Sequence, residues 1–409
     1  MKRNKACASI PVKLLASTPR GDVRVSGERA ARPLPSGPNA GQPEAVLACG
    51  PYLEAVRRFI FKDSCRQTIS AVSIFLGRSV ALAEIEGMEI RTEKHGACYQ
   101  VARLNVSVSG TVLSFVVNVA VDEAGKSTLQ REFRLLRRLA RRYRYSYLPQ
   151  VYFKGAVRYR EQSGAARWLH MFVGEWFRGY HEFHLHRSPA DDTARILLWD
   201  SAKGYRYLTD EQCSAIYRQA ARILTEYYDW NSFRQIHPWH HAAGDFVVRE
   251  QSGHVDVRLI TVRGHASVVD FKTRKRAGRL LALVLFFLHL TVQMRLDRLD
   301  GVGEVVWAGD SCLDGVVAGF FEGLAARDER GGKGMPSASE LRWLLSCFSR
   351  GEWLEMLGEM LETYSFSQEE LSLIKGHGLA HVVKLQQILN DLLPAIFAVS
   401  RHQFMKYPG

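Results

Sequence analysis

The 409-residue sequence predicts an α+β fold in two lobes, the first rich in strands and the second mainly helical. Between residues 85 and 178, hydrophobic and polar residues alternate and glycines mark the turns, which is typical of an antiparallel sheet. Beyond residue 179, most hydrophobic residues recur with the period of a helix. The composition, 46% hydrophobic and 24% charged, excludes a chain that is disordered throughout.

Residues 1–50 are expected to be a mobile, disordered basic tail. They hold six of the thirteen prolines, eight basic residues against three acidic ones, and no sustained hydrophobic period. Such a segment cannot bury enough apolar surface to offset its chain entropy. It either stays solvated or acts as an arm that touches an acidic surface. Residues 51–84 then show two hydrophobic helical patterns, which predict packing helices ahead of the sheet.

The β-rich lobe, residues 85–178, is predicted to be a five-stranded antiparallel sheet that carries one main helix. The strand patterns lie within residues 88–110, 111–122, 147–160 and 168–176. The helix covers residues 128–144 and has an apolar stripe of Leu129, Phe133, Leu136 and Leu139. Its other faces carry Arg134, Arg137, Arg138, Arg141 and Arg142. The helix is therefore expected to pack by one stripe and to present a basic surface elsewhere.

Residues 179–409 are predicted to form a helical lobe interrupted by one small hairpin. The helical patterns cover residues 209–229, 276–297, 311–326, 337–348, 351–363, 367–375 and 379–399. The hairpin is expected to pair strands within 254–262 and 266–271 around the turn at Arg263 and Gly264. The most apolar run, residues 280–294, is shorter than the roughly 18 residues that a membrane span needs. It predicts a buried core helix instead.

Cysteine usage and charge limit the classes of function. The seven cysteines are scattered and form no C-x-x-C pair, which argues against a disulfide framework or a zinc module and favours a reducing, cytoplasmic setting. The net charge of +13 brings an anionic partner into consideration, such as a nucleotide, nucleic acid or acidic membrane. This charge is concentrated, because the tail carries +5, residues 131–144 carry +6, and the rest of the chain carries +2.

The order of these elements resembles the protein-kinase-like superfamily, especially its aminoglycoside phosphotransferase and lipopolysaccharide kinase branches, over roughly residues 85–330. The resemblance implies ATP and Mg²⁺ as cofactors. In such a site, a cation and backbone groups meet the phosphates, carboxylates hold the metal, and a base orients the acceptor hydroxyl. The resemblance thus implies a nucleotide as the principal partner.

The resemblance assigns roles to residues of the first lobe. The turn at Gly96 would cover the phosphates, and Glu132 on the helix would face the strand that carries the family's lysine. This strand, FVVNVAVD, has no lysine. Depending on the register, Asn118 or Asp122 stands at the position where the lysine is expected. Glu175, in the segment FVGEW, would mark the hinge between the lobes.

The segment IHPWHHAAGDFVV stands where the resemblance puts the catalytic loop, and the later segment SVVDF contains Asp270. If the segment is aligned with the family by the strand that follows it, Asp245 takes a metal-binding position. His240 then takes the position of the catalytic aspartate. Aligned by Gly-Asp, Asp245 itself is the catalytic base. Asp245 and Asp270 are therefore predicted to hold Mg²⁺, with His241 or Asp245 serving the acceptor hydroxyl.

A structural interpretation of the same residues stays open. Asp245 could cap its strand, Asp270 could close a hairpin, and His237, His240 and His241 could form a hydrogen-bonded cluster. A zinc site made from these histidines would match neither H-E-x-x-H nor a closed Cys/His pattern.

Three functions stand as hypotheses. One is an atypical ATP-dependent phosphotransferase that acts on a hydroxyl of a small molecule, sugar or lipid. The second is a nucleotide-binding, pseudokinase-like module, which the missing lysine and the displaced aspartate favour. The third is a non-enzymatic basic module that binds nucleic acid or another anionic partner through helix 131–144. Nucleic acid is the less favoured partner, because the sequence contains no recognisable reading motif.

Overall fold

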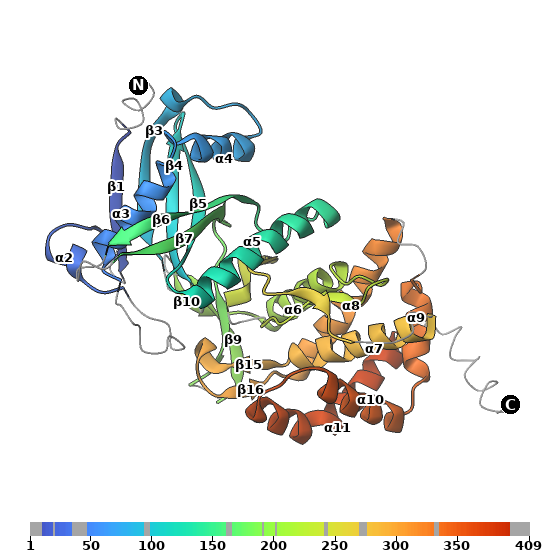
Figure 1. Ribbon diagram of the computed structural model, residues 1–409. Coiled ribbons are helices and arrows are strands. Elements are labelled where there is room, and N and C mark those ends of the chain that lie inside the picture. The colour runs from blue at the N-terminus through green and yellow to red at the C-terminus, as the bar shows by residue number, and fades with distance from the viewer. Residues whose placement is uncertain are drawn as a thin grey trace, which may run out of the picture. The chain divides into compact units, whose positions relative to one another are not determined.

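The computed structural model describes residues 10–18, 21–34, 47–93, 99–160, 166–189, 192–200, 203–240, 244–269, 276–330 and 335–392. The chain divides into two compact units, Met1–Gly179 and Tyr180–Gly409. Figure 1 shows the first unit in blue to green and the second in green to red. Both units contain helices and strands, which confirms the α+β class.

The first unit is built on a seven-stranded mixed sheet with the strand order β2-β1-β3-β4-β5-β7-β6. Its strands are β1 (Val12–Thr18), β2 (Gly21–Arg24), β3 (Ile85–Thr92), β4 (Gln100–Val108), β5 (Thr111–Ala120), β6 (Val151–Arg160) and β7 (Ala166–Glu175). The five strands that the sequence predicts are contiguous, β3 through β6, and each neighbouring pair is antiparallel. Two further strands extend the sheet beyond β3.

The prediction of a disordered tail over residues 1–50 is wrong for the part that the structure describes. Strand β1 pairs in parallel with β3, strand β2 returns antiparallel to β1, and a short helix α2 (Glu28–Ala31) follows. Ile10 and Leu34 are buried in the core of this unit. Composition misled the prediction, because the main-chain hydrogen bonds of a sheet edge depend little on which side chains the added strand carries.

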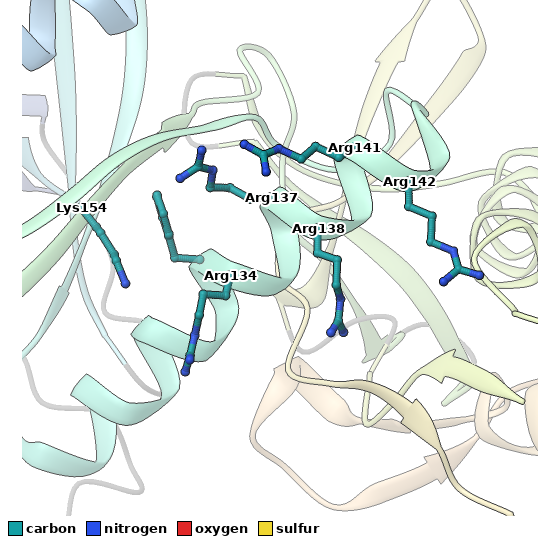
Figure 2. A pocket seen from close by; sticks show the side chains of 7 residues that line it. Arg134, Arg137, Arg138, Arg141, Arg142 and Lys154 are labelled. Carbon is teal, nitrogen blue, oxygen red and sulfur yellow. The ribbon is translucent and has the colours of Figure 1, made fainter. Parts of the chain in front are cut away.

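Helices cover both faces of the sheet. On one face, α3 (Cys49–Ile60) and α4 (Arg66–Leu76) join a hydrophobic core with the inward residues of β3, β4, β5 and β7. On the other face, α5 (Glu123–Tyr143) packs Leu129 and Phe133 against Ala120 and Phe172. Successive side chains of a strand point to opposite faces, so one sheet serves both cores. Figure 2 shows the arginines of α5 projecting away from the helix.

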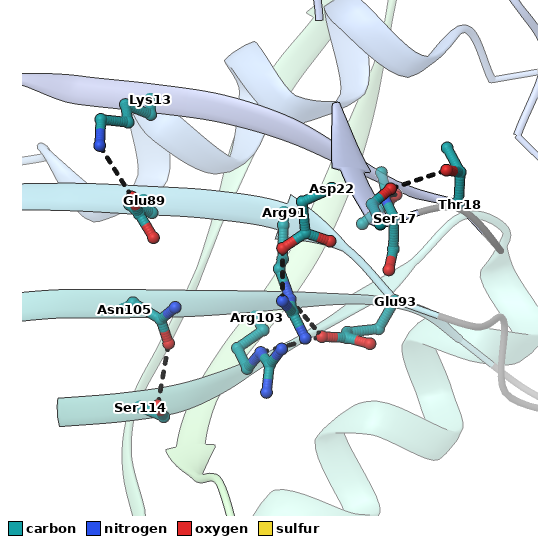
Figure 3. Close-up of polar contacts among 12 residues, drawn as sticks. Lys13, Ser17, Thr18, Asp22, Glu89, Arg91, Glu93, Arg103, Asn105 and Ser114 are labelled. Carbon is teal, nitrogen blue, oxygen red and sulfur yellow. Dashed lines mark hydrogen bonds and ion pairs between the residues drawn. The ribbon is translucent and has the colours of Figure 1, made fainter. Parts of the chain in front are cut away.

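The sheet face that carries α5 is polar toward the edge of β1 and β2, as Figure 3 shows. The guanidinium of Arg91 on β3 pairs with Asp22 of β2 at 2.6 Å and with Glu93 at 2.7 Å. The same Glu93 carboxylate lies 2.9 Å from Arg103 on β4. These ion pairs cross three strands and are partly shielded from water. They link the N-terminal strands to the predicted sheet.

The second unit contains most of the helices and several small sheets. Its strands are β8 (Phe183–Arg187), β9 (Ala194–Asp200), β10 (Gly204–Tyr207), β11 (Arg234–Ile236), β12 (Phe246–Gln251), β13 (His254–Leu259), β14 (His265–Ser267), β15 (Leu296–Arg298) and β16 (Val305–Trp307). Its helices are α6 (Asp210–Glu226), α7 (Arg276–Gln293), α8 (Asp310–Glu329), α9 (Ala338–Cys347), α10 (Arg350–Thr363) and α11 (Gln368–Asp391). The predicted helices from 209 to 363 are confirmed, with ends shifted by a few residues.

Two predictions for this unit are wrong. The expected single hairpin does not form: β13 pairs with β12, β14 pairs with β11, and two further small sheets occur. The two helices expected at 367–375 and 379–399 are one helix, α11, in its described part. Gly376 and Gly378 lie within the continuous helix, and Gly378 packs against Leu357 of α10.

The run 280–294 forms most of α7, and its residues are almost all buried, as predicted. Among the described helices, none is both long enough and apolar enough to cross a membrane. Among the described cysteines, Cys65 is disulfide-bonded, whereas Cys49, Cys213, Cys312 and Cys347 are free. This bonded cysteine departs from the reduced state that the cysteine pattern predicts.

Helices α6 and α8 pack at very close range through a glycine stripe. A Cβ atom at Gly315 would lie 2.6 Å from the Ser214 carbonyl oxygen, and one at Gly319 would lie 1.9 Å from that of Arg218. A Cβ at Gly323 would lie 2.8 Å from the side chain of Thr225 on α6. The three glycines recur every four residues and so share one face of α8. Only glycine fits this contact.

Gly319→Ala is expected to destabilise the protein by about 2 kcal/mol or more, because the new methyl group meets backbone that cannot move without separating the helices. Gly358 on α10 is the matched control, since a Cβ there meets nothing within 4 Å. Gly358→Ala should stabilise the chain by up to about 1 kcal/mol through helix propensity. Urea unfolding of both variants tests the contact, and equal effects would contradict it.

Candidate functional site

Asp245 occupies a tight turn that leads into β12. The preceding Gly244 has a positive φ of 74°, a conformation that favours glycine. The backbone N–H of Ile260 donates to the Asp245 carbonyl at 2.7 Å, and Phe246 pairs with Leu259 in the β12–β13 ladder. The residues that follow β13 therefore lie beside the residues that precede β12. This register brings Arg263 to Asp245.

The carboxylate of Asp245 is almost completely engaged by its neighbours. Arg263 donates from both terminal nitrogens, to Oδ1 at 2.6 Å and to Oδ2 at 2.7 Å. The backbone N–H of His240 also donates to Oδ2, at 2.8 Å. The side chain of Asp245 is 2% exposed and that of Arg263 is 26% exposed. Bidentate pairing of this kind is the strongest hydrogen-bonded geometry that a carboxylate and an arginine form.

This arrangement makes Asp245 a poor magnesium ligand, and the second predicted ligand, Asp270, lies outside the described residues, so the magnesium site stays a prediction. A magnesium ligand must offer a lone pair toward an open position, and Mg²⁺ usually keeps several waters. At Asp245 the two oxygens instead face a guanidinium and an amide. Among the described residues, no group of three or more His, Cys, Asp or Glu side chains could hold a metal ion. The zinc alternative likewise has no such group in the described part of the chain.

Three of the predicted site residues, Gly96, His241 and Asp270, lie outside the described residues. Their predicted roles therefore stay predictions. Arg263 is the residue that the sequence interpretation missed, because it was taken as part of a hairpin turn. Only the pairing of β12 with β13 reveals its position, and no spacing in the sequence marks it.

The other predicted residues lie in the first unit. Asn118 is on β5 and pairs in register with Val101 and Phe172. It is half-buried on the face that carries α5, so the strand position expected for the lysine holds a neutral amide. Asp122 is not on the strand: it caps α5 by accepting from the Gly125 amide at 2.6 Å. Of the two residues, only Asn118 lies on the strand, and its equivalence to the family's lysine stays a prediction.

Glu132 and Glu175 also occupy definite positions. Glu132 is 4% exposed, on the inward side of α5, as predicted from its place beside the apolar stripe. Glu175 ends β7, where its carboxylate accepts from the backbone N–H of Gln150 at 3.1 Å. Glu175 thus fixes the start of β6 against the end of β7. Helix α5, which carries Glu132, packs on β7 through the rings of Phe133 and Phe172, whose centroids are 5.7 Å apart, and Phe172 is the register partner of Asn118 on β5.

His237, one of the histidines before Asp245, belongs to an aromatic cluster with His289 and Tyr364. His289 of α7 stacks on Tyr364 with ring centroids 3.7 Å apart, and His237 lies edge-on to both. Burial lowers the pKa of His237 to about 4, and burial followed by the positive charge of Arg263 lowers the pKa of His240. Complete burial lowers the pKa of His289 well below its ordinary value. The cluster is therefore neutral at physiological pH and packs as hydrophobic core.

The second site is a basic pocket on the first unit, with a volume of about 560 Å³ (Figure 2). Its lining residues are Phe133, Arg134, Arg137, Arg138, Arg141 and Arg142 of α5 and Lys154 of β6. The sequence identified the arginines, but it could not show that Lys154 joins them. Lys154 and Arg137 both approach the ring of Phe133, at 5.4 and 5.6 Å from its centroid.

We found no protein family model that matches the chain and no curated protein sequence with a significant match.

The buried histidines predict how stability depends on pH. They bind fewer protons in the folded than in the unfolded chain, so their contribution is complete above the ordinary pKa of 6.5 and is lost as the pH falls toward about 4. Asp297, whose pKa burial raises from 3.8 to about 6, acts in the opposite direction. His289→Phe should keep the stack on Tyr364 and reduce the loss of melting temperature between pH 7.5 and 5.

The exposed His377 provides the control, because His377→Phe should leave the pH dependence as it is in the wild type. If His289→Phe keeps the full pH dependence as well, the buried cluster is not its source.

The Asp245 pair predicts an asymmetric loss of stability. Arg263→Met leaves a buried carboxylate without its cation and should cost about 3 kcal/mol or more. Asp245→Asn should cost less, because the partly exposed guanidinium regains water. The exposed pair of Arg249 with Asp256 is the control, and Arg249→Met should cost under about 1 kcal/mol. Urea unfolding measures all three, and similar small losses would show that the pair is not a buried constraint.

Proposed function

We propose that this chain is a non-catalytic, nucleotide-binding module of the protein-kinase-like type, a pseudokinase-like protein that works without magnesium. The observation that carries the proposal is the guanidinium of Arg263 on the carboxylate of Asp245. In the resemblance, Asp245 takes a metal-binding position, and a second metal-binding carboxylate ends the next strand. That second carboxylate is the predicted Asp270, which lies outside the described residues. Among the described residues, the charged side chain that meets Asp245 is an arginine.

A fixed arginine changes what the position can do. It supplies a permanent positive charge, because the guanidinium stays protonated at every physiological pH. It also engages both oxygens of Asp245, which makes this carboxylate less available as a metal ligand or general base. A phosphotransferase needs at least one such group to orient its acceptor. The proposal therefore favours binding over phosphoryl transfer.

The first unit supports the same choice. Its five contiguous antiparallel strands, with α5 inserted between β5 and β6 in the chain, agree with the sheet and helix that the resemblance implies. Asn118 provides no charge to meet phosphates at the strand position where an active kinase carries lysine. An active site would thus lack its strand cation, and its carboxylate at Asp245 is already paired with an arginine. Both differences point to a retained fold with a lost reaction.

The proposal predicts nucleotide binding that is independent of magnesium. ATP should raise the melting temperature equally in EDTA and in excess Mg²⁺, because the carboxylate of Asp245 is held by Arg263. Tripolyphosphate at the same concentration should raise it less, and this difference reports recognition of the adenosine part. No phosphate should be released from ATP over hours. Thermal shift and a phosphate-release assay provide these measurements.

Arg263→Gln is the informative variant, with Arg249→Gln of the same hairpin as control. Arg263→Gln should lower stability and gain no ATP turnover in Mg²⁺, whereas the control should change neither. A magnesium-dependent thermal shift, or turnover that Asp245→Asn abolishes, would instead establish an active enzyme. If ATP stabilises the protein no more than tripolyphosphate does, the nucleotide-binding part of the proposal is wrong.

A further inference from the structure

We propose that the basic pocket formed by α5 and Lys154 is a binding site for clustered phosphate groups, such as those of a small polyphosphorylated ligand. The shared chemistry is several phosphates on one compact scaffold, whether that scaffold is soluble or the headgroup of a lipid. This site goes beyond the proposed nucleotide site, since it rests on other residues and requires no adenine.

The charge of the pocket is the first argument. Its lining comprises five arginines, one lysine and one phenylalanine, and no acidic residue. Arg134, Arg138 and Arg142 follow one another at four-residue intervals along α5, as do Arg137 and Arg141. Like charges at this spacing are neighbours on a helix surface and destabilise it. An anion in the pocket would relieve this repulsion.

The geometry of the pocket is the second argument. The buried ring of Phe133 lies between the strand and the helix cations, with Lys154 at 5.4 Å and Arg137 at 5.6 Å from its centroid. In Figure 2 the side chains of Arg137 and Arg141 extend in the same direction from α5. Cations from a helix and from a sheet strand thus border one concave surface. Guanidinium groups bind phosphate in a bidentate manner, so several cations on one surface can hold several phosphate oxygens at once.

Size and surroundings favour a compact ligand over a nucleic acid. A volume of about 560 Å³ is within the range of small-molecule sites and exceeds what one phosphate ion fills. Single-stranded nucleic acid would need open aromatic faces on which bases stack. The nearby rings of Tyr143, Tyr145 and Tyr147 instead contact one another, with centroids 5.9 and 5.7 Å apart. The tyrosines interleaved with the arginines therefore pack as a local cluster.

The test compares two double variants of the full chain that remove the same charge from the same helix. Arg137→Gln with Arg141→Gln changes the pocket, whereas Arg131→Gln with Arg144→Gln changes exposed residues that do not line it. Inositol hexakisphosphate is the soluble probe in isothermal titration calorimetry. Phosphatidylcholine vesicles with and without phosphatidylinositol 4,5-bisphosphate are the lipid probe in a flotation assay. A single-stranded RNA of twelve nucleotides is the competitor.

We expect the pocket variant to lose affinity for the phosphate probes by about tenfold or more, because each arginine contributes charge-assisted hydrogen bonds. The control variant should stay within about twofold of the wild type, and the excess stabilisation by ATP over tripolyphosphate should persist in both. Preference for the soluble or the vesicle probe identifies the source of the phosphates.

Three results would overturn the proposal. Equal losses in the two double variants would mean that net charge, and not the pocket, attracts the probes. Absence of binding to both phosphate probes would mean that the pocket holds no such ligand. RNA that displaces the soluble probe with higher affinity, and depends on Arg131 and Arg144 as much as on the pocket, would assign the helix to nucleic acid. Unchanged circular dichroism of both variants excludes misfolding as the cause of a loss.

Discussion

The buried ion pair between Asp245 and Arg263 fixes the position and the hydrogen bonds of the one described carboxylate in the predicted catalytic segment. A carboxylate that is 2% exposed must be compensated, and Arg263 compensates it through two hydrogen bonds. The surrounding backbone holds the two residues together: Ile260 donates to the Asp245 carbonyl, and His237 donates to the carbonyl of Gly264. A Cβ at Gly264 would lie 2.4 Å from the His237 carbonyl oxygen, so glycine makes this approach possible. The strand pairing and the ion pair thus stabilise each other.

Helix α5 organises the first unit by using its two sides differently. Its apolar stripe packs on the sheet through Leu129 and Phe133, which fixes the helix rotation and so directs the arginines outward. Phe133 takes part in both sides, since it packs on Phe172 and also lies beneath Arg137 and Lys154. The basic pocket is therefore a consequence of how the helix packs.

The features that the sequence predicted are those that depend on local periodicity. The alternation of residues 85–178 gave the five strands, and the stripe of Leu129 and Phe133 gave the orientation of α5, including the buried Glu132. The features that it missed depend on pairing between distant segments. The β1–β3 pairing joins residues more than seventy positions apart, and the β11–β14 pairing separates strands that were expected to form one hairpin. Arg263 and Lys154 were missed for the same reason, because each acquires its partners through register and not through spacing.

The chain uses arginine in two physically opposite ways, and the contrast explains where binding is expected. Arg263 forms an ion pair with the buried carboxylate of Asp245, and this pair stabilises the fold. The lining of the pocket that Arg137 and Arg141 border includes no carboxylate, and like charges such as these two, four residues apart on a helix, repel one another. Solubility alone does not explain why these arginines gather in one pocket, because the same charges spread around the helix would keep the chain equally soluble. Six cations line this one pocket, and two of them lie over the ring of Phe133, so an external polyanion would reduce their mutual repulsion. The pocket is for this reason better explained by a ligand than by the fold.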